Sequence, residues 1–408
     1  MTGAAPLLAT LRILELGHYI AAPFATRVLA DLGADVIKVE PPGEGDPVRT
    51  WGTPFDGKSL WWSVHGRNKR SITLDLRRPE GQALALKLVA QADVVVENYK
   101  PGQLERWGLG PDALEAVRPG LVMVRISGFG QTGPHAKRAG FGVIGEAKGG
   151  LRHLCAHPGD VSELPPVRTG VSIGDSITGL YGALGALAAV IDQRATGRKK
   201  VRVIDAALGE AVLSVLEGTL PEYGALGIVR QPTGSTVPTT APSNAYRSKD
   251  GAWVIIGANS NPLWKALSAL MGQPELAEDP RFVDNRTRVA NARELDGLIG
   301  AWVGTLDAAD AIDRLEGADI PASKVYTVAD IAADPQFQSR KMVTSVADPA
   351  FGRDILHPGV VPVVSDLDRD AQIRWPGPAV GQHNADVYGG LLGLSTDDIG
   401  KLRETGII

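Results

Sequence analysis

The chain has 408 residues, of which 44% are hydrophobic and 22% charged, and its formal net charge is −4. This composition is typical of a globular protein, and the length exceeds what one hydrophobic core usually organises, so we expect two domains. The slightly acidic balance excludes a global basic field of the kind that attracts nucleic acid. A single cysteine, Cys155, excludes an internal disulfide and any metal site with several cysteine ligands.

Neither a targeting segment nor a membrane segment is expected. Residues 1–11 lack a basic region followed by a long apolar run, which argues against a secretory signal. We find no stretch of about 18 apolar residues free of charge, and therefore predict no transmembrane helix. The simplest location is the cytoplasm.

Over the first half of the chain, short apolar segments alternate with segments of helical spacing. This order predicts parallel β-α-β units and a doubly wound α/β sheet. The predicted strands are residues 11–16, 34–39, 71–76, 93–97, 121–126 and 200–204, and the predicted helices are residues 21–32, 79–91, 111–117, 180–191 and 206–217.

Residues 229–243 are rich in Thr, Pro, Ser and Gly and have no periodicity, which favours a linker or a mobile loop. Beyond it we predict an antiparallel strand pair over residues 344–364, around Asp348-Pro349, followed by a long polar tail. Between the two lie a predicted strand at residues 253–257 and predicted helices at 262–271, 293–303 and 308–316.

Asp175 lies in the segment Gly174-Asp175-Ser176-Ile177-Thr178-Gly179, directly before a predicted helix. Aspartate is a favoured N-cap because its carboxylate accepts the free N–H groups of the first turn, so a purely structural role is one interpretation. A nucleophile is the other, since the helix dipole keeps such a carboxylate ionised and a nucleophile must be ionised. The two roles are compatible.

Residues 67–77 place several cations around the start of a predicted strand. They form either a solvated charged edge or a cradle in which Arg and Lys match phosphate oxygens. Asn98 and Tyr99 follow another predicted strand, and therefore lie at the carboxyl end of the sheet. Ligands bind at that end in open α/β sheets.

Three other classes of site are disfavoured. Glu40 ends the second strand as the ribose-binding acid of dinucleotide folds does, but the first turn, from Gly17 to Ala22, lacks the G-x-G-x-x-G motif. The seven histidines show no ligand spacing, so we expect no metal site. A G-x-S-x-G elbow is missing, which disfavours a serine hydrolase.

Taken together and in chain order, these segments resemble the family-III CoA transferases, the formyl-CoA transferase or CaiB-like family. Residues 49–55, 127–134 and 138–141 are most similar to the branch that moves CoA from succinyl-CoA to glutarate, malate or similar dicarboxylates. The resemblance runs over residues 11–41, 67–77, 97–110, 127–134, 174–179 and 376–383.

The resemblance implies a Rossmann-like large domain built from both chain ends, a smaller α+β domain, and an interlocked homodimer. It places the large domain at residues 1–225, the small domain at 226–330 and the returning C-terminal segment at 331–408. It makes Asp175 the nucleophile, and acyl-CoA a substrate rather than a tightly bound cofactor. The implied CoA contacts are His18, Ala21, Arg70, Leu74, Leu76, Arg77, Asn98, Tyr99, Arg106 and Arg138.

The sequence departs from the formyl-CoA branch at Ile20, at Pro41 and at Phe141-Gly142, where that branch has a glutamine, an arginine and a Tyr-Glu pair. These differences argue against oxalate or formate as substrates. An α-methylacyl-CoA racemase of the same fold is the main alternative. That branch carries a Gly-His-Asp where this chain has Gly140-Phe141-Gly142, so the transferase is favoured.

A third hypothesis is a non-catalytic nucleotide-binding protein, which would need no nucleophile. Within the transferase hypothesis, Asp175 attacks a thioester and CoA passes through an enzyme anhydride and an enzyme thioester. The sequence does not name the acceptor acid. Arg49, Lys58 and Arg168 are candidates for binding its second carboxylate.

Overall fold

A computed structural model describes residues 5–408 and divides the chain into two compact units. The first unit comprises Met1–Arg152, Arg168–Ile228 and Pro335–Ile408, and the second comprises His153–Val167 and Val229–Asp334. Thus both chain ends belong to one unit. The segment His153–Val167, which the sequence analysis included in the N-terminal domain, groups with the second unit by its contacts.

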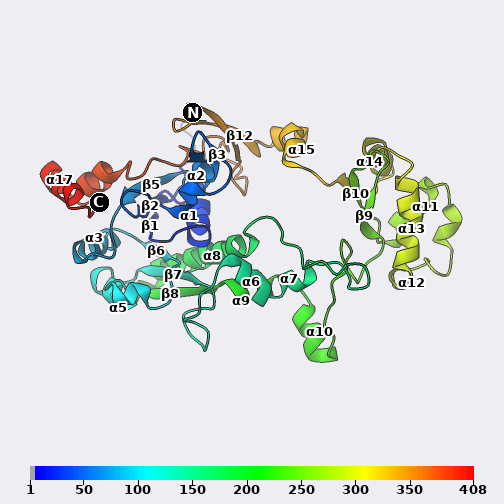
Figure 1. Cartoon of the computed structure of the whole chain (residues 1–408), viewed down its shortest axis with the longest axis horizontal. Helices are drawn as coiled ribbons and strands as arrows, with labels where there is room; N and C mark the ends of the chain where they lie inside the picture. The colour runs from blue at the N-terminus through cyan, green and yellow to red at the C-terminus, as the bar shows by residue number, and fades with distance from the viewer. Residues whose placement is uncertain (1–4) are drawn as a thin grey trace. The chain divides into compact units, whose positions relative to one another are not determined.

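A parallel six-stranded sheet forms the centre of the first unit within residues 5–408 (Figure 1). Its order is β5-β2-β1-β6-β7-β8, so the chain winds outward from β1 in one direction and from β6 in the other. The predicted doubly wound α/β sheet is confirmed. The strands are β1 (Arg12–Glu15), β2 (Asp35–Glu40), β5 (Lys69–Thr73), β6 (Val94–Glu97), β7 (Val122–Ser127) and β8 (Arg202–Ala207).

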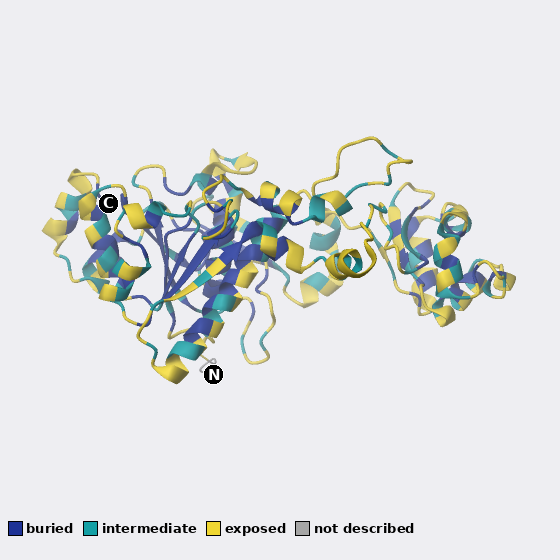
Figure 2. Cartoon of the chain, turned by 90° about the horizontal axis from the view of Figure 1, so that it is seen from below, coloured by how far each residue is buried: buried dark blue, intermediate teal, exposed yellow. Residues whose placement is uncertain are grey.

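Two hydrophobic cores lie on the two faces of this sheet, because successive strand residues point to opposite sides. Ile13 belongs to the core under α1 (Ala21–Asp31) and α8 (Ile173–Thr196), and Leu14 to the core under α3 (Pro79–Val89) and α5 (Pro111–Val117). Figure 2 shows the inner strands as dark blue, whereas the edge strand β8 is exposed along its first part.

Helix α8 begins at Ile173, seven residues before the predicted start, and ends at Thr196. Among the described residues it is the one helix whose length and composition would suit a membrane span. Here it packs on α1 and on the sheet as a core helix. The contact is close, because a Cβ on Gly179 would lie 2.7 Å from the Ala21 carbonyl oxygen.

The expected polar tail proved wrong. The C-terminus folds into η3 (Ala385–Leu391) and α17 (Thr396–Glu404), and both return to the core beside β5. The Tyr388 hydroxyl donates to the Thr73 carbonyl oxygen at 2.7 Å, and the Asp75 amide donates to the Ile407 carbonyl oxygen at 2.8 Å. The apolar residues that enter the core, among them Val387-Tyr388 and Ile407-Ile408, come in short groups separated by glycine and polar residues.

Further elements of the first unit are α6 (Gly142–Lys148), α9 (Leu208–Ser214) and the antiparallel pair β12 (Val343–Asp348) and β13 (Arg353–Pro358). The strand pair was predicted and α6 was not. The second unit holds a small antiparallel sheet, of order β11-β10-β9, whose core is built around Trp264. Its elements include β9 (Ser243–Arg247), β10 (Trp253–Gly257), β11 (Ala322–Lys324), α11 (Asn261–Leu270), α13 (Ala292–Val303) and α14 (Ala308–Gly317).

Candidate active site

The loops after β1 and β6 meet where the winding direction of the sheet reverses, which is the usual ligand position in an open α/β sheet. Asn98 holds them together: its Oδ1 accepts from the His18 amide and its Nδ2 donates to the His18 carbonyl oxygen, both at 2.8 Å. The His18 Nε2 lies 2.7 Å from the Tyr99 hydroxyl. A glycine precedes this turn because a Cβ on Gly17 would lie 2.8 Å from Asn98 Oδ1.

A cavity of about 800 Å³ opens at this point and reaches the first turn of α8. Asp175 and Arg168 line it together with the aromatic side chains of Trp51, Trp61 and Phe141. This volume is in the range of sites for small molecules and cofactors. Of the residues that the sequence predicted for CoA, the cavity contains His18, Ala21, Asn98, Tyr99 and Arg138.

A second cavity, of about 470 Å³, shares His18 and Tyr99 with the first. It is lined by three more of the predicted residues, Leu74, Leu76 and Arg77. The Arg77 guanidinium is exposed and forms two bonds of 2.8 Å to the Asp75 carboxylate. Two adjoining cavities therefore bring together eight of the ten predicted CoA contacts.

Glu40 also borders the second cavity, but its carboxylate is already bonded. Its Oε2 and Oε1 accept from Arg49 at 2.7 and 2.8 Å, and Ser71 donates to Oε1 at 2.5 Å. These bonds leave no free carboxylate for a ribose, in agreement with the absence of the dinucleotide motif.

The other predicted contacts lie elsewhere. Arg70 pairs with Asp35, with Nη2 to Oδ2 at 2.6 Å, at the opposite end of the strands. Arg106 is exposed on α4 (Gln103–Arg106), where it donates to Gln103, and lines neither cavity. Arg67 and Lys69 belong neither to a solvated charged edge nor to a phosphate cradle, because both are fully buried in ion pairs with Asp31 and Glu15.

Asp175 is the third residue of α8, and Ser172, not Asp175, is the N-cap. The N-cap interpretation was therefore wrong by three positions. The half-buried carboxylate points toward the start of α6, and a Cβ on Gly142 would lie 2.1 Å from its Oδ2. Any larger residue there would displace the Asp175 carboxylate. Phe141, next to it, is 66% exposed at the mouth of the cavity.

The electrostatics of Asp175 are unusual for a carboxylate in the first turn of a helix, where the dipole favours the charged form. The pKa of Asp175 is raised to about 6. Burial is the largest cause, the negative charge of Glu146 acts in the same direction, and Arg168 acts in the opposite direction. The carboxylate is thus ionised at neutral pH and remains more basic than a solvated aspartate, which suits a nucleophile.

Of the three candidates for binding a second carboxylate, only one lines the cavity of Asp175. Arg49 is bound to Glu40 and stacks on Trp62 at 3.7 Å, and Lys58 donates to the Ala350 carbonyl oxygen. Neither lines the cavity of Asp175. Arg168 does, and it is close enough to Asp175 to affect its pKa.

Sequence reasoning missed Glu146, a buried acid on α6. Its spacing of four residues from Gly142 places it on the same helical face only once α6 is known. It also missed the aromatic pair Trp51 and Trp61, whose ring centroids lie 6.1 Å apart in the cavity wall. Among residues 5–408, no cluster of three potential metal-ligating side chains occurs.

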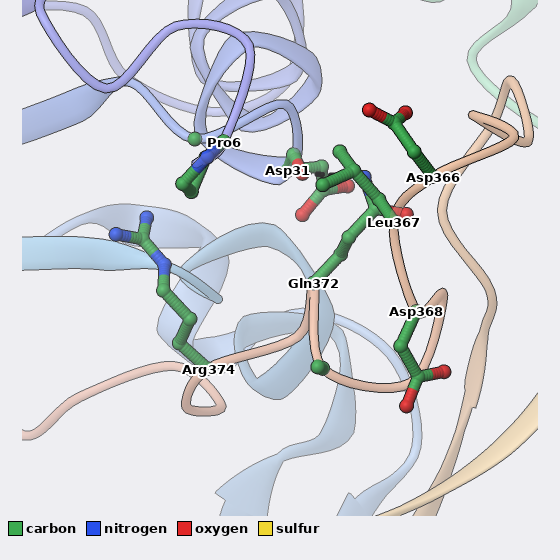
Figure 3. Close-up of a pocket in the computed structure, with 9 residues that line it drawn as sticks. Pro6, Asp31, Asp366, Leu367, Asp368, Gln372 and Arg374 are labelled. Carbon is green, nitrogen blue, oxygen red and sulfur yellow. Dashed lines mark hydrogen bonds between the residues drawn. The ribbon is translucent and has the colours of Figure 1, made fainter. Parts of the chain in front are cut away.

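A third cavity, of about 240 Å³, has none of these features (Figure 3). It lies between α1 and the C-terminal segment, and its side chains include three aspartates, Asp31, Asp366 and Asp368. Asp31 is bound to Arg67, and Asp368 to Lys341. Arg374 lines the cavity as well, so its walls carry both charges, and its volume lies below that of typical small-molecule sites, which argues against an acyl-CoA.

The chain is similar to known proteins over nearly its whole length. Residues 8–384 match the family model described as CoA-transferase family III. The chain is 46% identical to a succinyl-CoA–D-citramalate CoA-transferase of Chloroflexus aurantiacus, over 97% of both chains. It is 33% identical to the human succinyl-CoA:glutarate CoA-transferase, over 97% of this chain and 89% of that protein.

Among solved structures, a CaiB/BaiF family protein from Brucella suis is similar over 95% of this chain and 100% of its own, with a TM-score of 0.82 and 36% identity. The length of chain that matches and the sequence identity to these proteins together establish the family. This chain belongs to CoA-transferase family III and is a CoA transferase.

Proposed function

We propose that this enzyme moves CoA from succinyl-CoA to a small dicarboxylic acid, with Asp175 as the covalent carrier. The observation that carries the proposal is Asp175 itself, a basic, half-buried carboxylate held in a cavity of about 800 Å³. The names of the relatives support the substrate class, since they refer to succinyl-CoA with citramalate, malate or glutarate.

The reaction begins when an oxygen of Asp175 attacks the thioester carbonyl carbon of succinyl-CoA. The carbon–sulfur bond breaks, CoA leaves as a thiolate, and a mixed anhydride forms. The thiolate then attacks the aspartyl carbonyl carbon and releases succinate, which leaves an aspartyl–CoA thioester. The acceptor carboxylate attacks that thioester and expels the thiolate, which returns to the acceptor's carbonyl carbon. Product and free Asp175 result, with no net change of protons or electrons.

We infer that the two adjoining cavities divide the CoA molecule between them. The smaller one, with Leu74, Leu76 and Arg77, takes the adenine end, because it combines buried apolar walls with an exposed guanidinium. His18 and Tyr99 stand in both cavities, where the chain of CoA passes toward Asp175. Arg138, exposed in the larger cavity, is a further cation for the CoA phosphates.

For the remote carboxylate of the succinyl group and of the acceptor, we propose Arg168. It is the one of three sequence candidates that lines the cavity of Asp175. A guanidinium matches a carboxylate with two parallel N–H donors, so it selects acids that carry a second carboxylate.

We further propose a homodimer, of the interlocked kind that the family resemblance implies, located in the cytoplasm. Support comes from α8, where Leu180, Leu184 and Ile191 lie on one helical face and are 50%, 63% and 68% exposed in the single chain. Apolar rows of this kind are normally covered by a partner. Size-exclusion chromatography should give twice the chain mass, and an active monomer would contradict this part of the proposal.

The proposal is tested by incubating the enzyme with succinyl-CoA alone, quenching with acid and analysing the peptides by mass spectrometry. We expect the peptide containing Asp175 to carry a succinyl group or CoA, and hydroxylamine to trap the acylated carboxyl. The Asp175→Asn variant is the matched control and should stay unmodified. If the wild-type peptide is unmodified while transfer proceeds, the covalent mechanism is wrong.

A racemase mechanism makes the opposite prediction for deuterium. It needs a base within hydrogen-bond reach of the α-proton, and neither Phe141 nor Gly142 offers one. In heavy water, 2-methylacyl-CoA should therefore gain no α-deuterium, while CoA passes from succinyl-CoA to a C4 or C5 dicarboxylate. Deuterium uptake at turnover rates without any transfer would reverse the assignment.

A further inference from the structure

One face of the short helix α6 is packed against the start of α8. Gly142 and Glu146, four residues apart, lie on that face. Gly142 contacts the Asp175 carboxylate, and a Cβ on Gly174 would lie 3.2 Å from Glu146 Cγ and 3.1 Å from the Gly142 carbonyl oxygen. Successive residues of α8, Gly174 and Asp175, thus contact successive turns of α6. The two carboxylates are brought together by this packing.

Glu146 is an uncommon kind of buried acid. Its side chain is 0% exposed, and within residues 5–408 neither of its oxygens accepts a hydrogen bond. Its one ion pair is long, with 3.7 Å from Oε2 to Arg152 Nε. A buried carboxylate without donors is costly, so a role in folding does not explain it. The mechanism above does not use it either.

We propose that Glu146 is a positioning residue whose buried negative charge destabilises the free carboxylate of Asp175 relative to its neutral acylated forms. The first half-reaction converts the Asp175 anion into a neutral anhydride and then a neutral thioester, and the charge moves to CoA and then to the released acid. The second half-reaction returns the anion. Repulsion from Glu146 is present before acylation and absent afterwards. It therefore favours the attack of Asp175 and lets the covalent species accumulate.

The same repulsion explains the direction of the Asp175 pKa, which is raised to about 6 by burial first and by Glu146 second. The charged groups that face the pair are Arg168, from the loop before α8, and Arg152, beyond α6. Both are cations and oppose the effect. Glu146 is the charged neighbour that acts in the same direction as burial.

This inference rests on the proposed aspartyl mechanism, and Glu146→Gln tests it. The variant keeps the volume of the side chain and removes its charge. In the wild type, kcat/KM should fall as the pH drops through about 6, because a protonated Asp175 is no nucleophile. In Glu146→Gln this acid limb should move to lower pH. At neutral pH we expect a loss of roughly three- to tenfold in kcat and in the fraction of enzyme trapped as acyl or CoA adduct.

Two variants complete the experiment. Glu146→Met also removes the charge and makes the same prediction, which matters if a glutamine is not tolerated in this apolar setting. Glu80→Gln, on the exposed surface of α3, is the matched control and should leave the pH profile unchanged.

The inference is overturned if a folded Glu146→Gln or Glu146→Met enzyme keeps the wild-type acid limb and the wild-type amount of adduct. That outcome leaves the proposed function intact as long as the wild type still forms the Asp175 adduct. Absence of the adduct in the wild type itself would instead sink the proposed mechanism.

Discussion

Two clusters of buried charge lie in the same unit and differ in how they are compensated. In the first, Lys38 Nζ lies 2.7 Å from both Glu15 Oε1 and Asp46 Oδ2 and donates to the Gly17 carbonyl oxygen at 2.9 Å. Lys69 Nζ lies 2.8 Å from Glu15 Oε2. In the second, the negative charge of Glu146 acts on Asp175, with Arg168 and a distant Arg152 as counter-charges.

The pKa values show the same contrast. Burial opposes ionisation of Lys38 and Asp46, but their mutual attraction outweighs it, so the pKa of Lys38 is raised and that of Asp46 is lowered. At Asp175 burial and a like charge act together, and the pKa rises to about 6. The compensated cluster fixes the turn that carries His18 and Tyr19, since Asp46 Oδ1 accepts from the Tyr19 amide at 3.2 Å. The uncompensated cluster holds the proposed nucleophile.

The largest expected effect is at the uncompensated cluster. Asp175→Asn keeps the shape of the side chain but removes the proposed nucleophile. We expect transfer to fall by at least about ten-thousand-fold while CoA affinity stays close to that of the wild type. Steady-state kinetics and a CoA-binding titration measure the two quantities. A residual rate above about a hundredth of wild type would exclude a covalent role for Asp175.

Breaking the compensated cluster should affect folding rather than chemistry. Lys38→Met leaves Glu15 and Asp46 buried with one cation fewer, which typically costs about 3–5 kcal/mol of unfolding free energy. Chemical denaturation of the variant measures it. Lys341→Met is the control, because Lys341 pairs with Asp368 and Asp370 at the exposed surface and its loss should change little. An equal effect of both substitutions would show that the network around Lys38 contributes nothing special.

The sequence predicted features that have a local pattern, and it did not predict ion pairs between distant segments. Strands β1, β2, β6 and β7 are short apolar runs between turn residues, and they were predicted to within two residues at their ends. The cations of residues 67–77 were predicted to be available because nothing local showed their partners. Asp31, Glu15 and Asp35 lie 35 to 54 positions before their partners in the chain, and the pairing of β1, β2 and β5 with the packing of α1 brings them together.

Asp175 itself was identified from its glycine-flanked motif and the family resemblance, whereas its environment was not. Glu146 was hidden because α6 is only seven residues long and was not predicted. From the sequence, Gly142 indicated only that the acid or base of a racemase is missing at this position. The structure adds that a side chain there would displace the carboxylate of Asp175. Such close contacts between distant segments leave no local pattern in a sequence.

A smaller effect is expected at Arg168, the cation that lowers the pKa of Asp175. Loss of a charged hydrogen bond costs about 1.5–3 kcal/mol, so Arg168→Gln should raise KM for a dicarboxylate acceptor roughly ten- to hundredfold. KM for a monocarboxylate of equal length, such as butyrate, should stay unchanged. Arg138→Gln is the matched control and should weaken CoA binding with every acceptor. Equal losses for both kinds of acid in Arg168→Gln would remove it from acceptor recognition.

The smallest effect concerns stability, where the two clusters should respond with opposite signs. Because the pKa of Asp175 is raised to about 6 in the folded state, the native protein binds this proton more tightly than the unfolded chain does. Stability is therefore lost as the pH rises from the ordinary aspartate range through about 6, and the full penalty persists above it. Removing the charge should stabilise the protein at pH 7, unlike Lys38→Met.

We expect Asp175→Asn to gain about 1–2 kcal/mol at pH 7, after allowance for the partial exposure of the site, and hence a few degrees in Tm. The gain should disappear near pH 4, where the wild-type carboxyl is protonated as well. Thermal unfolding of both proteins at matched concentration between pH 4 and pH 8 measures this difference. A variant that is less stable than wild type at pH 7 would mean that Asp175 is compensated as fully as Lys38, and the contrast between the two clusters would not hold.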